Sequence, residues 1–289
     1  MSSLQNTKKV LYPSPLRYPG GKTKLSSFIA EVLASKNSNE VIFVEPFAGG
    51  AGAALSLLFA NKVSKIIIND LDPAIYAFWK TAVFNTDKFI DKIKHTKICM
   101  QEWEKQREIY KNPNSEEFVL GFATFFLNRT NRSGIIEAGP IGGYDQLGKW
   151  KINARFNKDD LINRLKKLKS YRKQINVINK DGISLLSELE EQVNAKKLFI
   201  FLDPPYIKKG QLLYLNHYKK ENHKNLSDFL QGSKLDWIMT YDDTSYIREL
   251  YSKKELKGFS IPYSAFSRKK GKEVLISPRI IRERIKIGG

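Results

Sequence analysis

Residues 41–52 read VIFVEPFAGGAG, and residues 65–84 read KIIINDLDPAIYAFWKTAVF. Each stretch opens with a short β-prone run, which is typical of a buried strand, and then passes into a helical pattern. In the second stretch, Asp72 followed by Pro73 predicts a helix start, because Asp caps the first turn and Pro fits the first helical position. The resulting β-α-β-α order predicts a doubly wound, mostly parallel α/β sheet. The expected elements are strands at 41–45 and 65–69 and helices at 53–60 and 72–84.

The regular pattern stops near residue 85 and resumes near residue 175. Between these points the sequence predicts helical stretches, a glycine-rich polar loop at 128–157 and a basic helix at 158–171. We therefore expect a discontinuous α/β domain made of residues 1–85 and 176–289, interrupted by a largely helical insert at 86–175. The strand-like segments of the second half lie at 175–179, 198–202, 235–240 and 274–277.

The chain of 289 residues carries a formal net charge of +19, and 42% of its residues are hydrophobic. The hydrophobic content is sufficient for a core and excludes global disorder. The positive charge favours a polyanionic partner, with nucleic acid first. It is concentrated in two segments, with 12 Lys and Arg against 4 Asp and Glu at 128–175, and 11 against 3 at 253–289. We expect these two segments to border a groove.

The composition disfavours several other classes of protein. No apolar run approaches the ~18 residues that a membrane span needs, and residues 1–10 lack the apolar core of a signal peptide. The single cysteine, Cys99, excludes an intrachain disulfide and forms no metal-binding pattern with His95, His217 or His223. We therefore expect a cytoplasmic protein with no metal site and no membrane contact.

The most informative stretch for chemistry is residues 198–206, LFIFLDPPY, in which an apolar strand ends at Asp203, Pro204, Pro205 and Tyr206. The prolines fix the backbone at the carboxyl end of the strand, where open α/β sheets bind their ligands. The exocyclic amine of a base is a poor nucleophile, because its lone pair is delocalised into the ring. Asp203 and the Pro204 carbonyl could accept both of its N–H groups, while Tyr206 stacks on the flipped base. A simple Pro-Pro turn after a strand is the alternative.

A cofactor site is indicated by the glycine turn at 49–52 and by Asp70. Glycine lets the backbone approach a ligand closely, and an acid at the end of the second strand accepts hydrogen bonds from ribose hydroxyls in doubly wound folds. Together they predict a nucleoside-bearing cofactor, although a tight turn and a capping Asp would also explain them. The glycine spacing differs from that of dinucleotide sites, which disfavours a nicotinamide oxidoreductase. Similarly, Leu16 stands where a phosphate loop ending at Lys22 would need glycine, which excludes a nucleotide triphosphatase.

Taken in order, residues 16–23, residues 43–52, Asp70 and residues 203–206 resemble the Dam-type, or D12 class, DNA adenine-N6 methyltransferases. The resemblance spans residue 16 to about residue 277, and it implies a Rossmann-like fold and S-adenosylmethionine as the cofactor. One departure is Ala51, where relatives often have glycine, so the geometry of the turn is open to question. By this resemblance, Tyr18 and Lys22 would lie against the cofactor, and Glu45 and Phe47 would flank its methionine and adenosine parts. Gly49 belongs to the turn, Asp70 would bind the ribose, and Asp181 would meet the adenine. Asp203 would face both the cofactor and the target amine.

Part of the insert also resembles this family. Residues 126–134 are similar to the start of the family's target-recognition segment. Arg, Lys and Asn side chains read base edges in the major groove, and others of the same types hold phosphates. For any single residue, a solvated basic loop is the alternative interpretation. The residues that we expect to contact DNA are Arg129, Asn131, Arg132 and Lys149.

The leading hypothesis is a site-specific methyltransferase that acts on N6 of a flipped adenine in duplex DNA, in a prokaryotic cytoplasm and with the nucleoid. A cognate restriction endonuclease is a further expected partner. Methylation of an exocyclic amine in RNA, methylation of cytosine N4, and a non-catalytic DNA-binding protein on a methyltransferase shell are the alternatives. A C5-cytosine mechanism is disfavoured, because it needs a cysteine nucleophile and Cys99 lies away from every motif.

Overall fold

The computed structural model describes residues 13–18, 21–34, 36, 40–192, 195–207, 218–252, 255–262 and 270–278. Our expectation for residues 1–10 lies outside these ranges, as does His217. Much of the basic segment at 253–289 lies outside them too, so the groove that we expected it to border is not described. None of the helices within the described ranges has the length and apolar character needed to cross a membrane.

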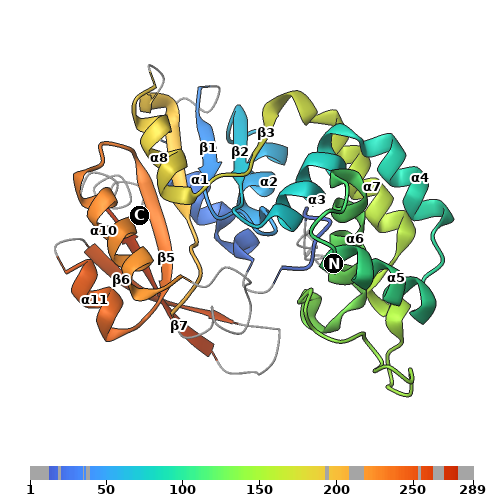
Figure 1. Cartoon of the computed structure of the whole chain (residues 1–289). Helices are drawn as coiled ribbons and strands as arrows, with labels where there is room; N and C mark the ends of the chain where they lie inside the picture. Colours follow the sequence, from blue (N-terminus) through green and yellow to red (C-terminus); the bar gives the residue numbers. More distant parts are fainter. Residues whose placement is uncertain are drawn as a thin grey trace, which may run out of the picture.

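A seven-stranded sheet forms the centre of the fold, with strand order β3-β2-β1-β4-β5-β7-β6 (Figure 1). The first five strands in this order run parallel, and β7 pairs antiparallel with both β5 and β6. The prediction of a doubly wound, mostly parallel sheet is therefore confirmed. The strands are β1 (Ile42–Glu45), β2 (Lys65–Asn69), β3 (Ile175–Ile178), β4 (Leu198–Leu202), β5 (Trp237–Asp242), β6 (Glu255–Pro262) and β7 (Lys270–Ser277).

The strand order reverses between β1 and β4. From β1 the chain moves outward through β2 to β3, and it then returns to the other side of β1 to form β4 and β5. In open α/β sheets, ligands bind at the carboxyl ends of the strands beside such a switch point. The sheet therefore points to the segments that follow β1 and β4 as its ligand site.

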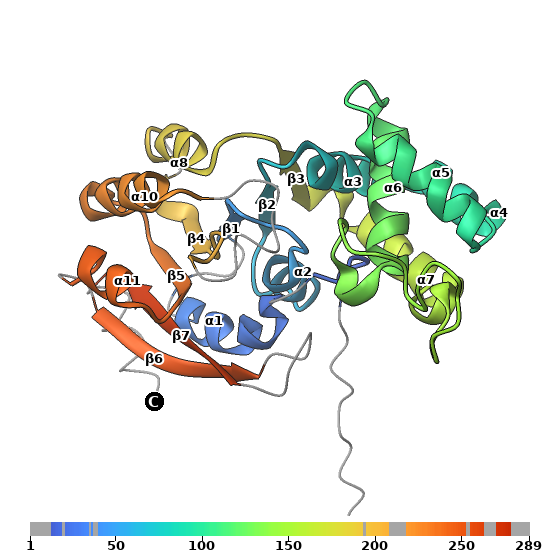
Figure 2. The same cartoon turned by 60° about the horizontal axis from the view of Figure 1, so that its bottom comes forward.

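Helices cover both faces of the sheet, as Figure 2 shows, with α8 and α10 on one side and α1 and α2 on the other. Successive residues of a strand point to opposite faces, and accordingly Phe43 packs in one core cluster and Val44 in the other. This double coverage explains why β4 and the inner residues of β1 and β2 form continuous apolar runs rather than alternating. The helices around the sheet are α1 (Ser26–Leu33), α2 (Gly52–Phe59), α3 (Pro73–Phe84), α8 (Gly182–Glu190), α10 (Lys220–Gly232) and α11 (Ser245–Leu250).

The predicted boundaries are closest where a capping residue or a strong apolar run marks them. Helix α3 begins at Pro73, and Asp72 caps it by accepting a hydrogen bond of 2.8 Å from the Ala74 backbone N–H. Strands β2 and β4 have the predicted bounds, whereas β7 begins four residues earlier than predicted, at Lys270. Strand β6 was not predicted, because its sequence, ELKGFSIP, contains an internal Gly and ends in Pro, both of which are unfavourable in strands.

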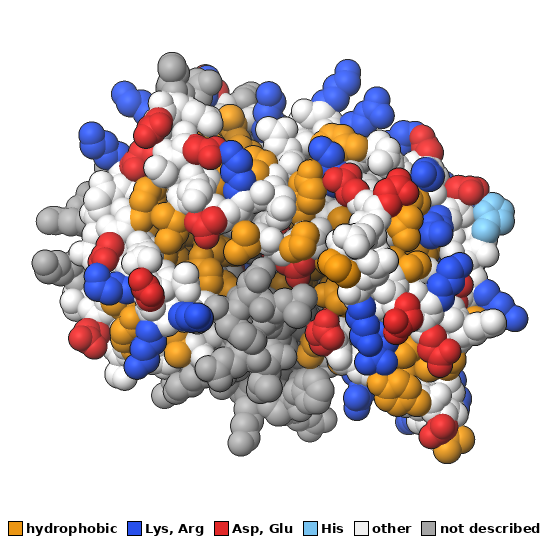
Figure 3. Space-filling view, in the orientation of Figure 1, with side chains coloured by type: hydrophobic (Ala, Val, Ile, Leu, Met, Phe, Trp, Pro, Cys, Tyr) orange, Lys and Arg blue, Asp and Glu red, His pale blue; other side chains and the backbone are white. Residues whose placement is uncertain are grey.

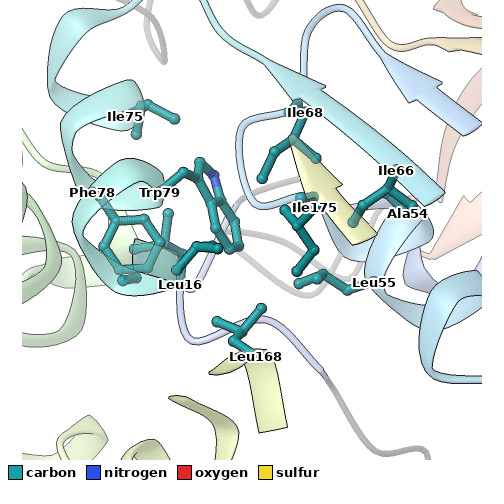
Figure 4. Packing of buried hydrophobic residues seen from close by; sticks show 14 of the residues in the cluster. Leu16, Ala54, Leu55, Ile66, Ile68, Ile75, Phe78, Trp79, Leu168 and Ile175 are labelled. Carbon is teal, nitrogen blue, oxygen red and sulfur yellow. The ribbon is translucent and has the colours of Figure 1, made fainter. Parts of the chain in front are cut away.

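The insert packs directly onto the sheet domain through α6 and α3. Phe125 of α6 stacks on Phe78 of α3 with 5.9 Å between ring centroids, and both belong to the core cluster that covers one face of the sheet. Figure 4 shows Leu16 and Leu168 beside Phe78 and Trp79 in the same cluster. The division of the chain into two domains stays a prediction. The helices of the insert are α4 (Thr86–His95), α5 (Met100–Lys111), α6 (Glu117–Thr130) and α7 (Lys158–Ser170).

Candidate active site

Four neighbouring strands carry predicted site residues at their carboxyl ends. In the order β3-β2-β1-β4, the segments that follow the strands contain Asp181, Asp70, Phe47 and Asp203. Neighbouring parallel strands lie about 4.8 Å apart, so these segments form a row along one edge of the sheet. The fold therefore brings together side chains that are up to 156 residues apart in the sequence.

The glycine turn after β1 is packed from two sides. A Cβ atom on Gly49 would lie 2.4 Å from the ring of Tyr18, and one on Gly50 would lie 2.7 Å from the Tyr18 Cβ. On the other side, the Trp79 indole N–H donates a hydrogen bond of 2.8 Å to the Gly49 carbonyl. Tyr18 therefore lies directly on the turn, and its contact with a cofactor stays a prediction.

Ala51 occupies a backbone conformation that glycine normally fills. Its φ and ψ angles are 47° and 36°, in the left-handed region, immediately before α2 begins at Gly52. This conformation costs a residue with a Cβ roughly 1–2 kcal/mol. The turn that relatives often build with glycine is thus formed here by alanine, at a cost in stability.

Asp70 joins the glycine turn to the end of β2. Its Oδ2 accepts a hydrogen bond of 2.8 Å from the Gly49 backbone N–H, and its Oδ1 accepts one of 3.0 Å from the Asp72 N–H. Burial, with a further contribution from the charge of Asp72, raises the pKa of Asp70 to about 7. A carboxylate has roughly four acceptor positions, so these two bonds leave capacity for ligand hydroxyls.

A buried amide, which the sequence did not single out, holds the loops after β1 and β3 together. The Asn69 side chain donates to the Pro46 carbonyl at 2.8 Å and to the Lys180 carbonyl at 2.9 Å, and it accepts from the Lys180 N–H at 2.9 Å. Asn69 is fully buried at the last position of β2. A polar residue that ends an apolar strand is the sequence signal that could have identified it.

Asp181 and Phe47 meet at the start of α8. The Asp181 Oδ1 caps the helix by accepting hydrogen bonds of 3.0 Å from the Ile183 and Ser184 backbone N–H groups. A Cβ atom on Gly182 would lie 2.6 Å from the Phe47 ring, so that ring packs on the first turn of the helix. The edge of Tyr218 contacts Phe47, with 5.6 Å between the ring centroids. The site thus has an aromatic ring beside a partly exposed carboxylate.

Glu45 is a buried acid at the base of the site. It is 4% exposed, and its Oε1 accepts a hydrogen bond of 2.9 Å from the Ala54 N–H in α2. Burial raises the pKa of Glu45 to about 8; the Ala54 hydrogen bond and the charge of Lys22 act against this shift, and the charge of Asp203 adds to it. Glu45, Lys22 and Asp203 are therefore close enough to influence one another electrostatically.

Asp203 is held by three side-chain donors. Its Oδ2 lies 2.8 Å from the Lys22 Nζ, and its Oδ1 accepts hydrogen bonds from the Tyr206 hydroxyl at 3.0 Å and the Thr240 hydroxyl at 2.6 Å. The Asp203 side chain is 23% exposed, whereas that of Lys22 is 4% exposed. Lys22 also lies 3.9 Å from Glu273 Oε2. Two predicted residues, Lys22 and Asp203, are thus in direct contact.

Tyr206 is more enclosed than a stacking surface would be. It is 9% exposed, its ring centroid lies 6.0 Å from that of Tyr241, and the Lys22 Nζ lies 5.0 Å from its ring centroid. Burial raises the pKa of the Tyr206 phenol well above its usual range. Pro204 is buried as well. The Ile207 backbone N–H donates a hydrogen bond of 3.3 Å to Asp242 Oδ1. Stacking of Tyr206 on a base stays a prediction.

A model of the D12 class N6 adenine-specific DNA methyltransferases matches residues 18–268. The chain belongs to this family. The chain is also similar to a Type II methyltransferase, M.CviBI, from Paramecium bursaria Chlorella virus NC1A. The two are 28% identical over 254 residues, which cover 82% of this chain and 85% of the viral protein. The predicted family, and with it an enzyme that methylates adenine in DNA, is therefore confirmed.

In this D12 class methyltransferase, two of the four predicted DNA contacts are buried. Asn131 is fully buried, its Oδ1 accepts from the Trp103 indole N–H at 2.6 Å, and its Nδ2 donates to the Ile136 carbonyl at 2.7 Å. Arg129 is 8% exposed. The reason is that α6 continues to Thr130, so Arg129 lies in the helix and Asn131 caps its end, where a loop was predicted. Asn131 thus has structural partners in this conformation, and base reading by Asn131 stays a prediction.

The other two predicted DNA contacts, Arg132 and Lys149, are exposed. The Lys149 Nζ lies 5.9 Å from the ring centroid of Trp150, which is itself 64% exposed. Leu147, two residues before Lys149, is 85% exposed. Figure 3 shows hydrophobic and basic side chains at the lower right of the molecule, where the insert projects. This part of the methyltransferase is open to a macromolecular partner.

Proposed function

We propose that the enzyme uses S-adenosylmethionine to methylate N6 of an adenine that has been flipped out of duplex DNA, with Asp203 and Pro204 holding the amine. The observation that carries this proposal is the row of acidic and aromatic side chains that ends at Asp203. It lies beside the switch point of the sheet, and it matches the family's motifs in type and in order.

The residues of the row are suited to the parts of this cofactor. Asp70 retains acceptor capacity for ribose hydroxyls, and among the described residues no donor to the Asp181 Oδ2 is found, so that this oxygen can accept from an adenine amine. Phe47 offers an aromatic surface next to Asp181. When bound, the cofactor supplies a methyl group on a positively charged sulfur. The residues that would hold it are Tyr18, Lys22, Glu45, Phe47, Gly49, Asp70, Asp181 and Asp203.

In the proposed mechanism, the protein orients a weak nucleophile rather than removing a proton from it first. An Asp203 oxygen and the Pro204 carbonyl would accept the two N–H groups of the adenine amine, which turns the nitrogen lone pair toward the methyl group. Thr240 keeps the Asp203 carboxylate in one orientation through its hydrogen bond to Oδ1. Transfer would break the methyl–sulfur bond as the new C–N bond forms, and the proton would then leave the nitrogen for solvent water. Pro205 fixes the backbone between these groups and Tyr206, which we propose as the stacking ring.

We further propose that residues 86–175 form the target-recognition domain, in which the exposed Arg132 and Lys149 contact duplex DNA. Their exposure and the net positive charge of the chain support this role. A partner restriction endonuclease is supported by the name of the viral relative, a Type II methyltransferase. A location with the nucleoid in a prokaryotic cytoplasm stays part of the same proposal.

The test is transfer of tritium from methyl-labelled S-adenosylmethionine to duplex DNA, with RNA of matched sequence in parallel. We expect label on N6 of adenine in DNA; label on RNA alone would overturn the choice of substrate. The Asp203→Ala variant should lose transfer while still binding the cofactor in calorimetry. Full transfer by that variant would contradict the role of Asp203.

A further inference from the structure

Three arginines from separate segments of the chain lie close enough to Arg129 to act on it electrostatically, and one of them, Arg17, also contacts the Asn131 carbonyl. Arg17 lies in the segment before η1 (Lys22–Leu25), Arg129 near the end of α6, Arg155 at the end of η3 (Ile152–Arg155), and Arg164 in the middle of α7. Arg129 is 8% exposed, and within the described ranges no acceptor contacts its Nε. A buried guanidinium with an unused N–H donor is costly unless something neutralises it.

Hydrogen bonds hold the surrounding segments in place. The Asn128 side chain accepts from the Arg17 backbone N–H at 2.7 Å and donates to the Arg17 carbonyl at 2.9 Å. The Arg17 guanidinium donates to the Asn131 carbonyl at 3.3 Å, and Arg164 donates to the Ser14 carbonyl at 2.8 Å. Residues 14–17 are therefore fixed to both α6 and α7, and the positions of the arginines are determined by the fold.

The charges in this cluster are poorly balanced. Burial, together with the charges of Arg164, Arg17 and Arg155, lowers the pKa of Arg129 to about 9, whereas Asp160 acts in the opposite direction. The Asp160 carboxylate is already paired with Arg164 at 2.8 Å. The described groups that act on the charge of Arg129 are thus three arginines and one acid. Like charges gathered in a partly desolvated place disfavour the folded state unless an anion joins them.

We propose that Arg17, Arg129, Arg155 and Arg164 form a binding site for a phosphate group of the DNA backbone. The guanidinium group is suited to this ligand, because its planar N–H donors match two phosphate oxygens at once. That the phosphate belongs to DNA rests on the proposed function, whereas the anion site itself rests on the cluster. Because Arg17 directly precedes Tyr18, a phosphate bound here would join the insert to the segment that lies on the cofactor turn.

The first test uses the Arg129→Met variant and inorganic phosphate as the probe. In a buffer free of phosphate and sulfate, we expect Arg129→Met to unfold at a higher temperature than the wild type, because it removes a buried charge from a repulsive cluster. Added phosphate should raise the unfolding temperature of the wild type and have a smaller effect on the variant. If Arg129 were only structural, the variant would unfold at a lower temperature and would keep the full phosphate effect, which would overturn the proposal.

The second test identifies the source of the phosphate with two surface variants of the same chemistry. Arg155→Gln removes a member of the cluster, and Arg172→Gln removes an exposed arginine two residues after the end of α7. For Arg155→Gln we expect weaker binding to duplex DNA of any sequence and a slope of log affinity against log salt that is smaller by about one. Arg172→Gln should change the DNA affinity and the salt slope much less than Arg155→Gln does.

Both variants should bind S-adenosylmethionine as the wild type does, which shows that the sheet domain is intact. Phosphate-dependent stabilisation without any change in DNA affinity would restrict the site to free anions and overturn its assignment to DNA. A failure of the proposed function is distinguishable from this result, because neither test measures methyl transfer.

Discussion

The Lys22 Nζ lies 2.8 Å from Oδ2 of Asp203, although the two residues are 181 positions apart in the sequence. This contact joins the Gly-Gly-Lys segment of the N-terminal region to the acid that ends β4. Because Lys22 is 4% exposed, its charge is largely removed from water and needs nearby acids for compensation, among them Asp203 at 2.8 Å and Glu273 at 3.9 Å. The contact therefore couples the stability of the fold to the chemistry of the site.

Replacing Lys22 by Gln should affect both properties. We expect the variant to lose about 2 kcal/mol of unfolding free energy, since a partly buried carboxylate is left without its cation, and to transfer methyl groups at least about tenfold more slowly. Urea unfolding and single-turnover kinetics would measure the two effects. Lys24→Gln, which changes an exposed lysine two residues away, is the control and should behave as the wild type does.

Thr240 should act as a positioning residue for Asp203. Thr240→Val removes the hydroxyl that donates to Oδ1 at 2.6 Å but keeps a similar volume, and Thr240→Ser keeps the hydroxyl. We expect the Val variant to lower kcat by about tenfold, which corresponds to one lost hydrogen bond to a charged group, with little change in cofactor affinity. A Ser variant as impaired as the Val variant would show that the volume of the side chain matters rather than its hydroxyl.

Ala51→Gly should stabilise the enzyme. The substitution releases left-handed strain of roughly 1–2 kcal/mol, about half of which is offset by the greater freedom of glycine in the unfolded chain. We therefore expect a gain of about 0.5–1 kcal/mol in urea unfolding. Ala54→Gly, three residues further on inside α2, has no strain to release and should lose about 1 kcal/mol. Equal losses in both variants would contradict the strain at Ala51.

The buried carboxyl of Glu45 should make stability decrease as the pH rises. Its pKa of about 8 in the folded protein exceeds its ordinary value of 4.5, so between these pH values the folded state binds more protons than the unfolded state. Unfolding then becomes easier toward pH 8, and the effect is complete above it. The raised pKa of Asp70, about 7, acts in the same direction.

Glu45→Gln isolates this effect, because the amide oxygen can still accept from the Ala54 N–H. We expect the unfolding free energy of the variant, relative to that of the wild type, to increase between pH 4 and pH 9 by on the order of a few kcal/mol. Urea unfolding at a series of pH values measures that difference. If the difference in unfolding free energy between wild type and variant does not change with pH, Glu45 does not titrate in this range.

Asn131 and Lys149 should separate structure from DNA contact. We expect Asn131→Ala to lose about 2–3 kcal/mol, because the Trp103 indole N–H and the Ile136 carbonyl lose a buried partner. Lys149→Ala should leave stability unchanged. It should reduce the slope of log DNA affinity against log salt by about one, which corresponds to one lost phosphate contact. Unchanged stability of Asn131→Ala would contradict the structural role assigned to it.

Local signals predicted the sheet well and the insert less well. Asp72 with Pro73 and the apolar runs of β2 and β4 marked element boundaries directly, because capping and burial act within a few residues. The end of α6 was missed because Asn128, Arg129 and Thr130 are polar and resemble a loop. The side chains of Asn128 and Thr130 instead form hydrogen bonds inside the fold, for example between Asn128 and the Arg17 backbone.

The same distinction applies to the site. The motifs identified Asp203 and Lys22 separately, but no local pattern indicates that they touch, since their contact depends on strand order. Thr240 and Asn69 were missed for a related reason. Each is a single polar residue in a strand, and its role appears only when the neighbouring strand or loop is in place.

The placement of β7 between β5 and β6 has a consequence for how the enzyme is made. Strand β6 is synthesised before β7, the strand with which it pairs, and Glu273 of β7 lies near Lys22 although it is synthesised 251 residues later. Until residues 270–277 have been synthesised, β5 has one uncovered edge and Glu273 is absent from the vicinity of Lys22. A chain that ends before residue 270 would therefore keep an unpaired strand edge, and we expect it to aggregate more readily than a chain that contains β7.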